Sequence, residues 1–298
     1  MSRRRGGDGP DGLVVVDKEA GWTSHDVVAK ARGLLGTRKV GHSGTLDPDA
    51  TGVLLLGVGR VTRLLRYLTA LGKTYTCEIV LGAETSTLDA SGDVVARHEM
   101  AGTGFDAVER AAAGLTGDIL QVPPMVSAVK VGGRRLHELA REGVEVEREA
   151  RPVTVHRFAV HPTDEPLVVR AEVECSSGTY VRTLAADLGR ALGGGAHLRD
   201  LRRTAIGSFT LAEARPLAEI GPEVLLSPAE ALRDLPRAVA TDLEVEAVGH
   251  GKVLDRDERF AGDGPWAVVA ADGRLLAVYG AHRGATVKPE VVVAPAGG

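Results

Sequence analysis

The chain has 298 residues, 44% of them hydrophobic, and a formal net charge of -4 at pH 7, so it can bury one large core and a small second domain. It has no run of about 18 apolar residues that could cross a membrane, and residues 3–5, all arginine, are not followed by the apolar segment of a signal peptide. Two cysteines, Cys77 and Cys175, are too few for a disulfide framework or a cysteine-only metal site. We therefore expect a cytoplasmic protein with no membrane partner.

The charges are unevenly distributed along the chain. Residues 1–80 carry 12 Lys and Arg against 8 Asp and Glu, and residues 176–215 carry 6 against 3, whereas residues 81–120 and 216–298 are acidic. A net charge is a sum over regions of opposite sign, so a protein that is acidic overall can still present a basic surface to RNA.

Ordered structure is expected to begin at Gly12. Residues 1–11 are polar and rich in Gly and Arg, which predicts disorder. Residues 13–16 form an apolar run typical of a strand. A helix capped by Ser24 and ended by Gly36 should follow. Its apolar side is predicted to consist of Val27, Val28, Ala31, Leu34 and Leu35.

A glycine-rich stretch at residues 39–52 has the composition of a ligand-binding loop. It contains Asp47, and Pro48 biases this aspartate toward an extended backbone that displays its carboxylate. The apolar residues 53–56 predict a buried strand that anchors the loop. The alternative is an ordinary turn in which Asp47 has no chemical role. Three glycines lack side chains where a ligand could approach the backbone: Gly41, Gly44 and Gly52.

The next two elements are predicted to be a helix at 61–71 and a strand at 73–81. The helix has apolar residues at helical spacing, and the strand contains Tyr75 in an alternating pattern, where a tyrosine is usually packed. The arginines beside this helix are available for phosphates or for solvent: Arg60, Arg63 and Arg66.

The middle of the chain is predicted to be structural: a loop at 85–92, a short helix at 105–114, a rigid proline-containing connector at 122–125, and a helix at 135–141 that ends at Gly143. His137 and Glu138 lack the second histidine of an HExxH zinc site. We find no metal-ligand cluster in the sequence.

Residues 167–179 are predicted to form a strand and then a turn, with a helix that starts near Tyr180. Arg182 falls in the first turn of this helix, where the helix dipole disfavours a cation, so its position is easier to explain if a carboxylate lies close by. The alternative is an ordinary exposed arginine. In the basic segment 198–206, Leu201 is the candidate for a buried or base-contacting residue.

From Pro216 the composition changes. An acidic linker is followed by a predicted short helix near 228–235. Residues 236–298 contain short strands broken by glycine-containing turns, which is typical of a small all-β module.

The string GHSGTLDPDATGVLLLGVGRVTRLL at residues 41–65 closely resembles the active-site motif of the bacterial TruB family of pseudouridine synthases, the tRNA pseudouridine-55 synthases. Further blocks resemble the same family in the family's order: KTY at 73–75, LG at 81–82 with Thr85, PPMVSAVK at 123–130, CSSGTYVR at 175–182, GAHL at 195–198 and LRR at 201–203. They cover roughly residues 12–210. The set is specific, although each block alone is weak evidence.

The resemblance implies an α+β fold. It places a catalytic domain with a mixed, largely antiparallel sheet at 12–235, after the disordered tail at 1–11, and a small β-rich PUA-like RNA-binding domain at 236–298. It implies isomerisation of uridine 55 in the TΨC arm of tRNA, in which the N1–C1′ bond is cleaved and the base is rejoined through C5 without redox change. It implies no cofactor and no metal, and we expect a monomer whose partner is the TΨC stem-loop of tRNA.

The resemblance also assigns residue roles. Asp47 would be the nucleophile, attacking either the ribose C1′ or the base, and Arg182 would keep it ionised and oriented in a partly dry pocket. Tyr75 would stack on the base that is flipped out of the RNA, and it is a candidate proton acceptor. His42 would either fill the place of the flipped base or stabilise the loop. The other substrate-binding candidates are Lys73, Tyr180, Leu201 and Arg202.

Two other classes of function stay open on the residues alone. A non-catalytic RNA-binding or tRNA-folding protein would use the basic segments and the C-terminal module, but it would not need Asp47. A nucleoside-type glycosidase would pair Asp47 with Asp49 or Asp89 and would release free uracil.

Overall fold

The computed structural model describes residues 9–127, 130–131, 133–135, 142, 144 and 146–294. The chain divides into two compact units, formed by 1–48, 53–69 and 207–298 in the first and by 49–52 and 70–206 in the second. No helix within the described residues is long and apolar enough to span a membrane. The predicted domain boundary between residues 235 and 236 stays a prediction.

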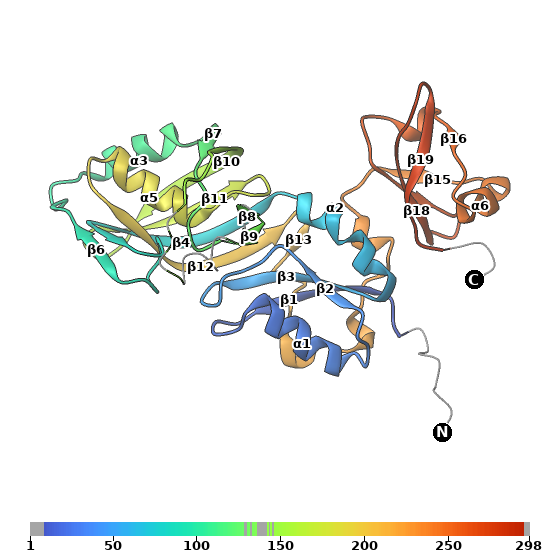
Figure 1. Ribbon diagram of the computed structural model, residues 1–298, viewed down its shortest axis with the longest axis horizontal. Coiled ribbons are helices and arrows are strands. Elements are labelled where there is room, and N and C mark those ends of the chain that lie inside the picture. Colours follow the sequence, from blue (N-terminus) through green and yellow to red (C-terminus); the bar gives the residue numbers. More distant parts are fainter. Residues whose placement is uncertain are drawn as a thin grey trace. The chain divides into compact units, whose positions relative to one another are not determined.

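Antiparallel strands form the centre of the second unit, in the order β12-β4-β11-β10-β7 (Figure 1). Their bounds are β4 (Lys73–Leu81), β7 (Gly117–Gln121), β10 (Arg151–Pro162), β11 (Val168–Cys175) and β12 (Ala196–Ile206). Along β4 the odd-numbered residues are buried, because side chains alternate between the two faces of a sheet. The predicted strands at 73–81 and 167–175 are confirmed.

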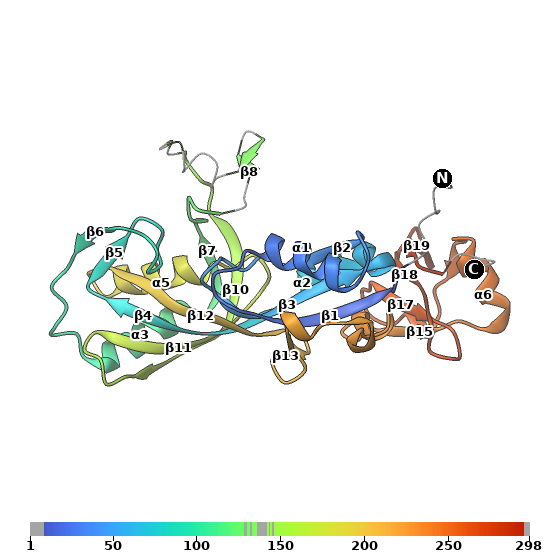
Figure 2. The ribbon, with the colours of Figure 1, turned by 90° about the horizontal axis from the view of Figure 1, so that it is seen from below.

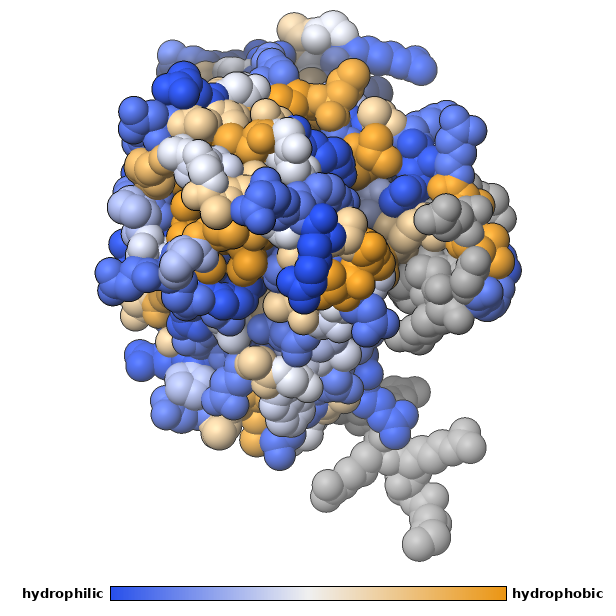
Figure 3. All heavy atoms as spheres, turned by 90° about the vertical axis from the view of Figure 1, so that its left-hand side faces the viewer, coloured by the Kyte–Doolittle hydropathy of each residue, from blue (hydrophilic) through white to orange (hydrophobic). Residues whose placement is uncertain are grey.

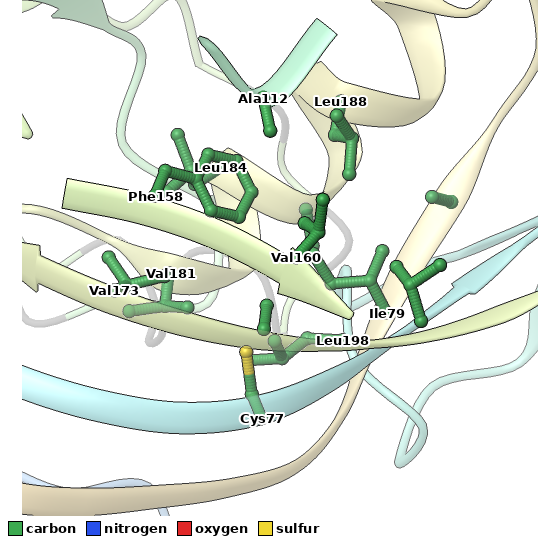
Figure 4. Packing of buried hydrophobic residues seen from close by; sticks show 14 of the residues in the cluster. Cys77, Ile79, Ala112, Phe158, Val160, Val173, Val181, Leu184, Leu188 and Leu198 are labelled. Carbon is green, nitrogen blue, oxygen red and sulfur yellow. The ribbon is translucent and has the colours of Figure 1, made fainter. Parts of the chain in front are cut away.

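Helices α3 (Phe105–Gly114) and α5 (Val181–Ala191) supply the helical part of this unit's core. Ala112 of α3 and Leu184 and Leu188 of α5 pack with Phe158 and Val160 of β10 (Figure 4). Both helices were predicted, and α5 is amphipathic because its apolar residues recur every three or four positions. The smaller pairs are β5 (Ala83–Thr85) with β6 (Val94–Arg97) and β8 (Lys130–Val131) with β9 (Arg134–Arg135).

The predicted helix at 135–141 falls almost wholly outside the described residues. Arg135, which is described, belongs to the strand β9 and not to a helix. His137, Glu138 and the predicted helix end at Gly143 lie outside the described residues, as does the predicted disorder of residues 1–8.

The N-terminal part of the first unit places the Asp47 loop between two strands. Strand β2 (Val40–Ser43) pairs antiparallel with β3 (Thr51–Val58) (Figure 2). Strand β1 (Gly12–Lys18) pairs in parallel with β14 (Arg215–Pro216). The predicted buried strand after the loop is confirmed, since residues 53–56 of β3 are fully buried. The remaining elements here are α1 (Ser24–Leu34), η1 (Gly59–Leu64), α2 (Leu65–Ala70), β13 (Phe209–Thr210), η2 (Leu217–Glu219), η3 (Pro222–Val224) and η4 (Glu230–Leu232).

Three details of this part differ from expectation. Thr23, not Ser24, caps α1, because Thr23 and Asp26 form a reciprocal capping box. Leu34 is exposed, whereas the other predicted apolar positions of α1 are buried. Asp11 is not disordered, since its carboxylate accepts hydrogen bonds from the backbone N–H and the Nε of Arg60, each at 2.5 Å.

The C-terminal residues of the first unit form a sheet in the order β15-β17-β18-β19-β16. Its core contains Phe260, Trp266 and Tyr279. The expectation of an all-β module is wrong because the segment includes α6 (Asp242–Gly249), which Thr241 and Glu244 cap, although the module is β-rich. The bounds are β15 (Arg237–Val239), β16 (Leu254–Asp255), η5 (Glu258–Phe260), β17 (Trp266–Val269), β18 (Leu275–Ala281) and β19 (Thr286–Val292).

The arginines predicted to meet phosphates or solvent are exposed, as the solvent alternative expected, and they also contact the C-terminal end of this sheet. Arg63 Nη1 donates to the Val292 carbonyl at 2.8 Å, and Arg66 Nη2 lies 2.7 Å from Glu290 Oε2. Arg60 Nη1 donates to the Val293 carbonyl at 3.2 Å. Their repeat of three residues puts them on one side of the η1–α2 segment, where their partners are Glu290 and Val292 of β19 and the adjoining Val293.

Candidate active site

The residue before Asp47 is fastened to helix α1. Leu46 N donates to Ser24 Oγ at 2.9 Å, and Ser24 Oγ donates to the Leu46 carbonyl at 3.2 Å. Ser24 is fully buried and is available for this pair because Thr23 caps the helix. From the sequence, Ser24 was expected only to cap the helix.

The residue after Asp47 is held by a buried lysine. Lys18 is 1% exposed, and its Nζ donates to the Pro48 carbonyl at 2.9 Å. It also donates to the carbonyls of Trp22 at 2.8 Å and Glu19 at 3.0 Å. Asp47, which is half-buried, therefore lies between two anchored neighbours, and the loop holds its carboxylate in a repeatable position.

Two glycines of the loop are required by the protein's own packing. A Cβ on Gly52 would lie 2.1 Å from the Arg203 carbonyl oxygen, and its φ of +100° also favours glycine. A Cβ on Gly41 would lie 2.9 Å from Leu65 Cδ1. At these two positions glycine makes room for the protein's own packing, and the predicted approach of a ligand to the loop glycines stays a prediction.

His42 lies on β2, opposite Leu56 of β3. Its ring is half-buried and meets the ring of His25 edge to face, with 5.2 Å between the centroids. His42 and Asp47 both belong to the first unit, and Tyr75, Arg182 and the other predicted site residues belong to the second.

Arg182 is held at the start of α5 by three oxygen atoms. Its Nη2 donates to the Val126 carbonyl at 2.8 Å and its Nη1 to the Thr87 carbonyl at 3.2 Å. Its Nη1 also lies 3.4 Å from Asp89 Oδ2, and the side chain is 6% exposed. The prediction of a carboxylate close to Arg182 is thus confirmed for Asp89, whereas the alternative of an ordinary exposed arginine is wrong.

The loop at 85–92, predicted to be purely structural, orients Asp89. Asp89 Oδ1 accepts from Thr87 Oγ1 at 2.6 Å, from Ser91 Oγ at 2.5 Å and from Ser91 N at 3.1 Å. Thr85 Oγ1 donates to the Asp89 carbonyl at 2.6 Å. Hydroxyl residues on both sides of one aspartate are the signal by which the sequence could have indicated this role.

Tyr180 occupies the N-cap position of α5. Its backbone N donates to Gln121 Oε1 at 2.7 Å, and Gln121 Nε2 donates to the Tyr180 carbonyl at 3.1 Å. Gln121 is buried at the end of β7, so this pair fixes the start of the helix that carries Arg182. The ring of Tyr180 stays half-exposed.

Tyr75 and Lys73 lie on the same face of β4, next to Arg203 of β12. Arg203 is 1% exposed; burial lowers its pKa, and a hydrogen bond with Tyr75 offsets part of that effect. Lys73 is buried, and its Nζ donates to the Leu71 carbonyl at 2.6 Å. Desolvation, with Arg203 nearby, lowers the pKa of Lys73 to about 8. Its predicted substrate contact stays a prediction.

Leu201 and Arg202 lie on β12, next to the strand β4 that carries Tyr75. The pairing of β12 with β4 is irregular there. Leu201 is half-buried and packs against the core of the second unit. Arg202 Nη1 approaches Thr51 Oγ1 at 3.2 Å, and Arg202 pairs with Thr51 through the backbone. Leu201 thus packs against the core cluster that contains Tyr75, whereas Arg202, opposite Thr76, lies on the other face of the sheet from Tyr75.

Two family models match the sequence. The model for the TruB family pseudouridylate synthase (N terminal domain) matches residues 32–181, and that for the tRNA pseudouridylate synthase B C-terminal domain matches residues 182–240. The chain belongs to the TruB family. It is 48% identical over 297 residues to "tRNA pseudouridine synthase B" of Arthrobacter sp. (strain FB24), covering 95% of this chain and 97% of that protein. It is 50% identical over 294 residues to the protein of that name from Mycolicibacterium paratuberculosis (strain ATCC BAA-968 / K-10), covering 96% and 99%.

Solved structures show the same α+β fold. A chain of a Cbf5-Nop10-Gar1 complex superimposes with a TM-score of 0.74 at 26% identity, covering 99% of this chain and 92% of that one. A chain of an H/ACA RNP bound to a substrate RNA containing 2′-deoxyuridine superimposes with a TM-score of 0.73 at 25% identity, covering 95% and 85%. The predicted fold class, a TruB-type catalytic fold with a β-rich C-terminal part, is confirmed.

Proposed function

We propose that this pseudouridine synthase acts on tRNA and converts uridine 55 of the TΨC arm to pseudouridine, with Asp47 as the nucleophile. Relatives of nearly equal length are named tRNA pseudouridine synthase B, which supports tRNA as the substrate. The observation that carries the assignment to Asp47 is the anchoring of its loop, in which Leu46 is held by Ser24 and Pro48 by Lys18. Such a loop presents one carboxylate in a fixed place.

The reaction breaks the N1–C1′ bond of the uridine, turns the base and forms a C5–C1′ bond. The proton on C5 is lost and N1 ends protonated, so the product is an isomer of the substrate. An ionised Asp47 attacks either C1′ or the base and leaves again when the new bond forms. Arg182 is proposed to favour the ionised carboxylate by its charge, and Tyr75 to take up the proton from C5.

Base flipping is part of this proposal, since the reacting atoms of a stacked uridine are not accessible. Tyr75 is proposed to stack on the flipped base and His42 to occupy the place it leaves. We assign the remaining substrate contacts to Tyr180, Leu201, Arg202 and Lys73. The enzyme is expected to be a cytoplasmic monomer that needs no cofactor.

Residues 236–298 are proposed to be a PUA-like module that adds affinity for tRNA, while 12–235 carry the chemistry. The five-stranded sheet of this segment supports the assignment. The contacts of Arg63 and Arg66 with the strand β19 tie the module to the segment that follows β3.

The experiment that tests the proposal is an assay of unmodified tRNA with the purified protein, followed by mapping of the modified position. We expect pseudouridine at position 55 and no free uracil, and a transcript with cytidine at position 55 should give no product. Release of free uracil would instead support the glycosidase, and binding without any product would support a non-catalytic RNA-binding protein.

A further inference from the structure

A cleft of about 700 Å³ lies in the second unit, beside the segments that hold Arg182. Its walls come from the loop after β5, the segment after β7 and one face of α5. Thr87 and Val126, whose carbonyls accept hydrogen bonds from Arg182, both line it. The volume is that of a site for a small organic ligand, and none of the predicted site residues lines it.

Among the described residues of the cleft, one cationic side chain has a donor to spare. The charged lining residues that the structure describes are Glu84, Arg148, Asp187 and Arg190. Asp187 pairs with Arg190 at 2.5 Å, and Glu84 Oε1 is hydrogen-bonded to the His98 ring at 2.7 Å. Arg148 donates from Nη1 to the Pro123 carbonyl at 3.0 Å, and its buried Nε meets no acceptor among the described residues. A single guanidinium with an unused donor fits one anionic group.

The rim of the cleft is apolar and exposed. Val95 is 63% exposed and Leu120 is 72% exposed, and Val122 and Met125 continue the same wall. Figure 3, which views this end of the second unit, shows hydrophobic patches among hydrophilic side chains. Apolar side chains of this kind can pack against the face of an unstacked base.

We propose that this cleft binds a second unstacked nucleotide of the RNA substrate, with its base against Val95 and Leu120 and its phosphate at Arg148. The inference rests on the proposed function, because it adds a contact to the same RNA, but it concerns a nucleotide other than the one that reacts. One guanidinium with an unused donor beside an apolar wall matches one nucleotide better than a longer backbone segment, which requires several cations.

Two adjacent valines of β6 provide the main test. Val94 and Val95 are both largely exposed, and their side chains point to opposite faces of the strand, but only Val95 lines the cleft. We expect Val95→Glu to raise the tRNA concentration for half-maximal single-turnover rate about tenfold, the loss of roughly one base contact, and Val94→Glu to change it less than about twofold. The rate at saturating tRNA should stay the same in both.

Arg148→Gln tests the phosphate contact, with the exposed Arg151→Gln as its control. If Arg148 binds a phosphate, its loss should lower the slope of log affinity for tRNA against log salt concentration by about one, while the control leaves the slope unchanged. Equal slopes in the two variants would contradict the contact.

The methionines allow a direct test on the protein. Met125 lines the cleft and Met100 is buried elsewhere, so methyl-labelled methionine gives a reporter and an internal control. Added uridine 5′-monophosphate should shift the Met125 signal in wild type and Val94→Glu, less in Val95→Glu, and never the Met100 signal.

An unmoved Met125 signal, or equal effects of Val94→Glu and Val95→Glu on tRNA affinity, would overturn the proposal. A fall in saturated rate with unchanged affinity would also overturn it, since the cleft would then act only through Arg182. The affinity for tRNA and the methyl shifts are measured without turnover. The proposal for the cleft can therefore fail while the enzyme still forms pseudouridine, and it can hold in a protein that forms none.

Discussion

Lys18 and Pro48 are 30 residues apart in the sequence, and the buried ammonium of the first donates a 2.9 Å hydrogen bond to the carbonyl of the second. This bond fixes the backbone directly after Asp47. The same ammonium serves the carbonyls of Glu19 and Trp22, so one buried charge ties the end of β1 to the loop. The loop that carries Asp47 is therefore held in place by a residue outside the loop.

Replacing Lys18 by Met should therefore loosen the loop and destabilise the fold. The change removes the hydrogen bonds from a charged donor to the carbonyls of Glu19, Trp22 and Pro48, which costs about 2 kcal/mol in the free energy of unfolding. Urea denaturation should show this loss, and the single-turnover rate at saturating tRNA should fall about tenfold or more. Lys30→Met, at an exposed position on α1, is the control and should change neither quantity.

Substitutions of Ser24 and Thr23 distinguish the effect of anchoring the Asp47 loop from the effect of capping helix α1. Ser24→Ala removes both hydrogen bonds to Leu46, so we expect a slower single-turnover rate with a small loss of stability. Thr23→Ala removes the capping box and should cost about 1 kcal/mol in stability while the rate at saturating tRNA is kept. Thermal unfolding and single-turnover kinetics measure the two effects, and the reverse pattern would show that Ser24 acts as a cap.

Asp89→Asn should act through Arg182. The amide keeps the shape of the carboxylate but loses its charge, so Arg182 is less firmly oriented and the saturated rate should fall roughly tenfold to a hundredfold. The affinity for tRNA should change little, because neither residue is expected to bind phosphate. Asp93→Asn, at an exposed position of the same hairpin, is the control. An equal loss of affinity and rate would assign Arg182 to the RNA backbone.

Lys73 gives a pH dependence with a defined sign. Burial lowers its pKa from 10.5 to about 8, so the unfolded chain binds this proton more tightly than the folded protein does. The stability of wild type relative to Lys73→Met should accordingly rise between about pH 8 and 10.5, by at most about 3 kcal/mol. Urea denaturation of both proteins from pH 7 to 10 measures the difference, and a constant difference would contradict the lowered pKa.

The sequence predicts the elements of the fold well where the pattern is local. The alternating pattern at 73–81 corresponds to a strand of the structure, and the helical spacing after Tyr180 corresponds to a helix. Burial of one face imposes a period of two residues on a strand and of 3.6 residues on a helix. The cap of α1 was placed one residue late, since serine and threonine stand side by side and both are good caps.

The supports of the candidate site could not be predicted in the same way. Lys18, Gln121 and Arg203 are buried polar residues. Lys18 contacts Pro48 30 positions away, Gln121 contacts Tyr180 59 positions away, and Arg203 pairs with Tyr75 on another strand. Nothing in their local pattern distinguishes them from exposed residues. The role of Gly52 likewise depends on the Arg203 backbone of another strand. Asp47 itself could be singled out only because the whole string around it resembles a known family.

The central claim is that Asp47 is the nucleophile, and single-turnover formation of pseudouridine at saturating tRNA tests it most directly. Asp47→Asn keeps the shape of the side chain and removes the charge, so we predict a loss of at least about a thousandfold in rate, with tRNA affinity within about threefold of wild type. Asp49→Asn, at the exposed position two residues later, should react at the wild-type rate. An Asp47→Asn protein that forms pseudouridine within tenfold of the wild-type rate would contradict the account.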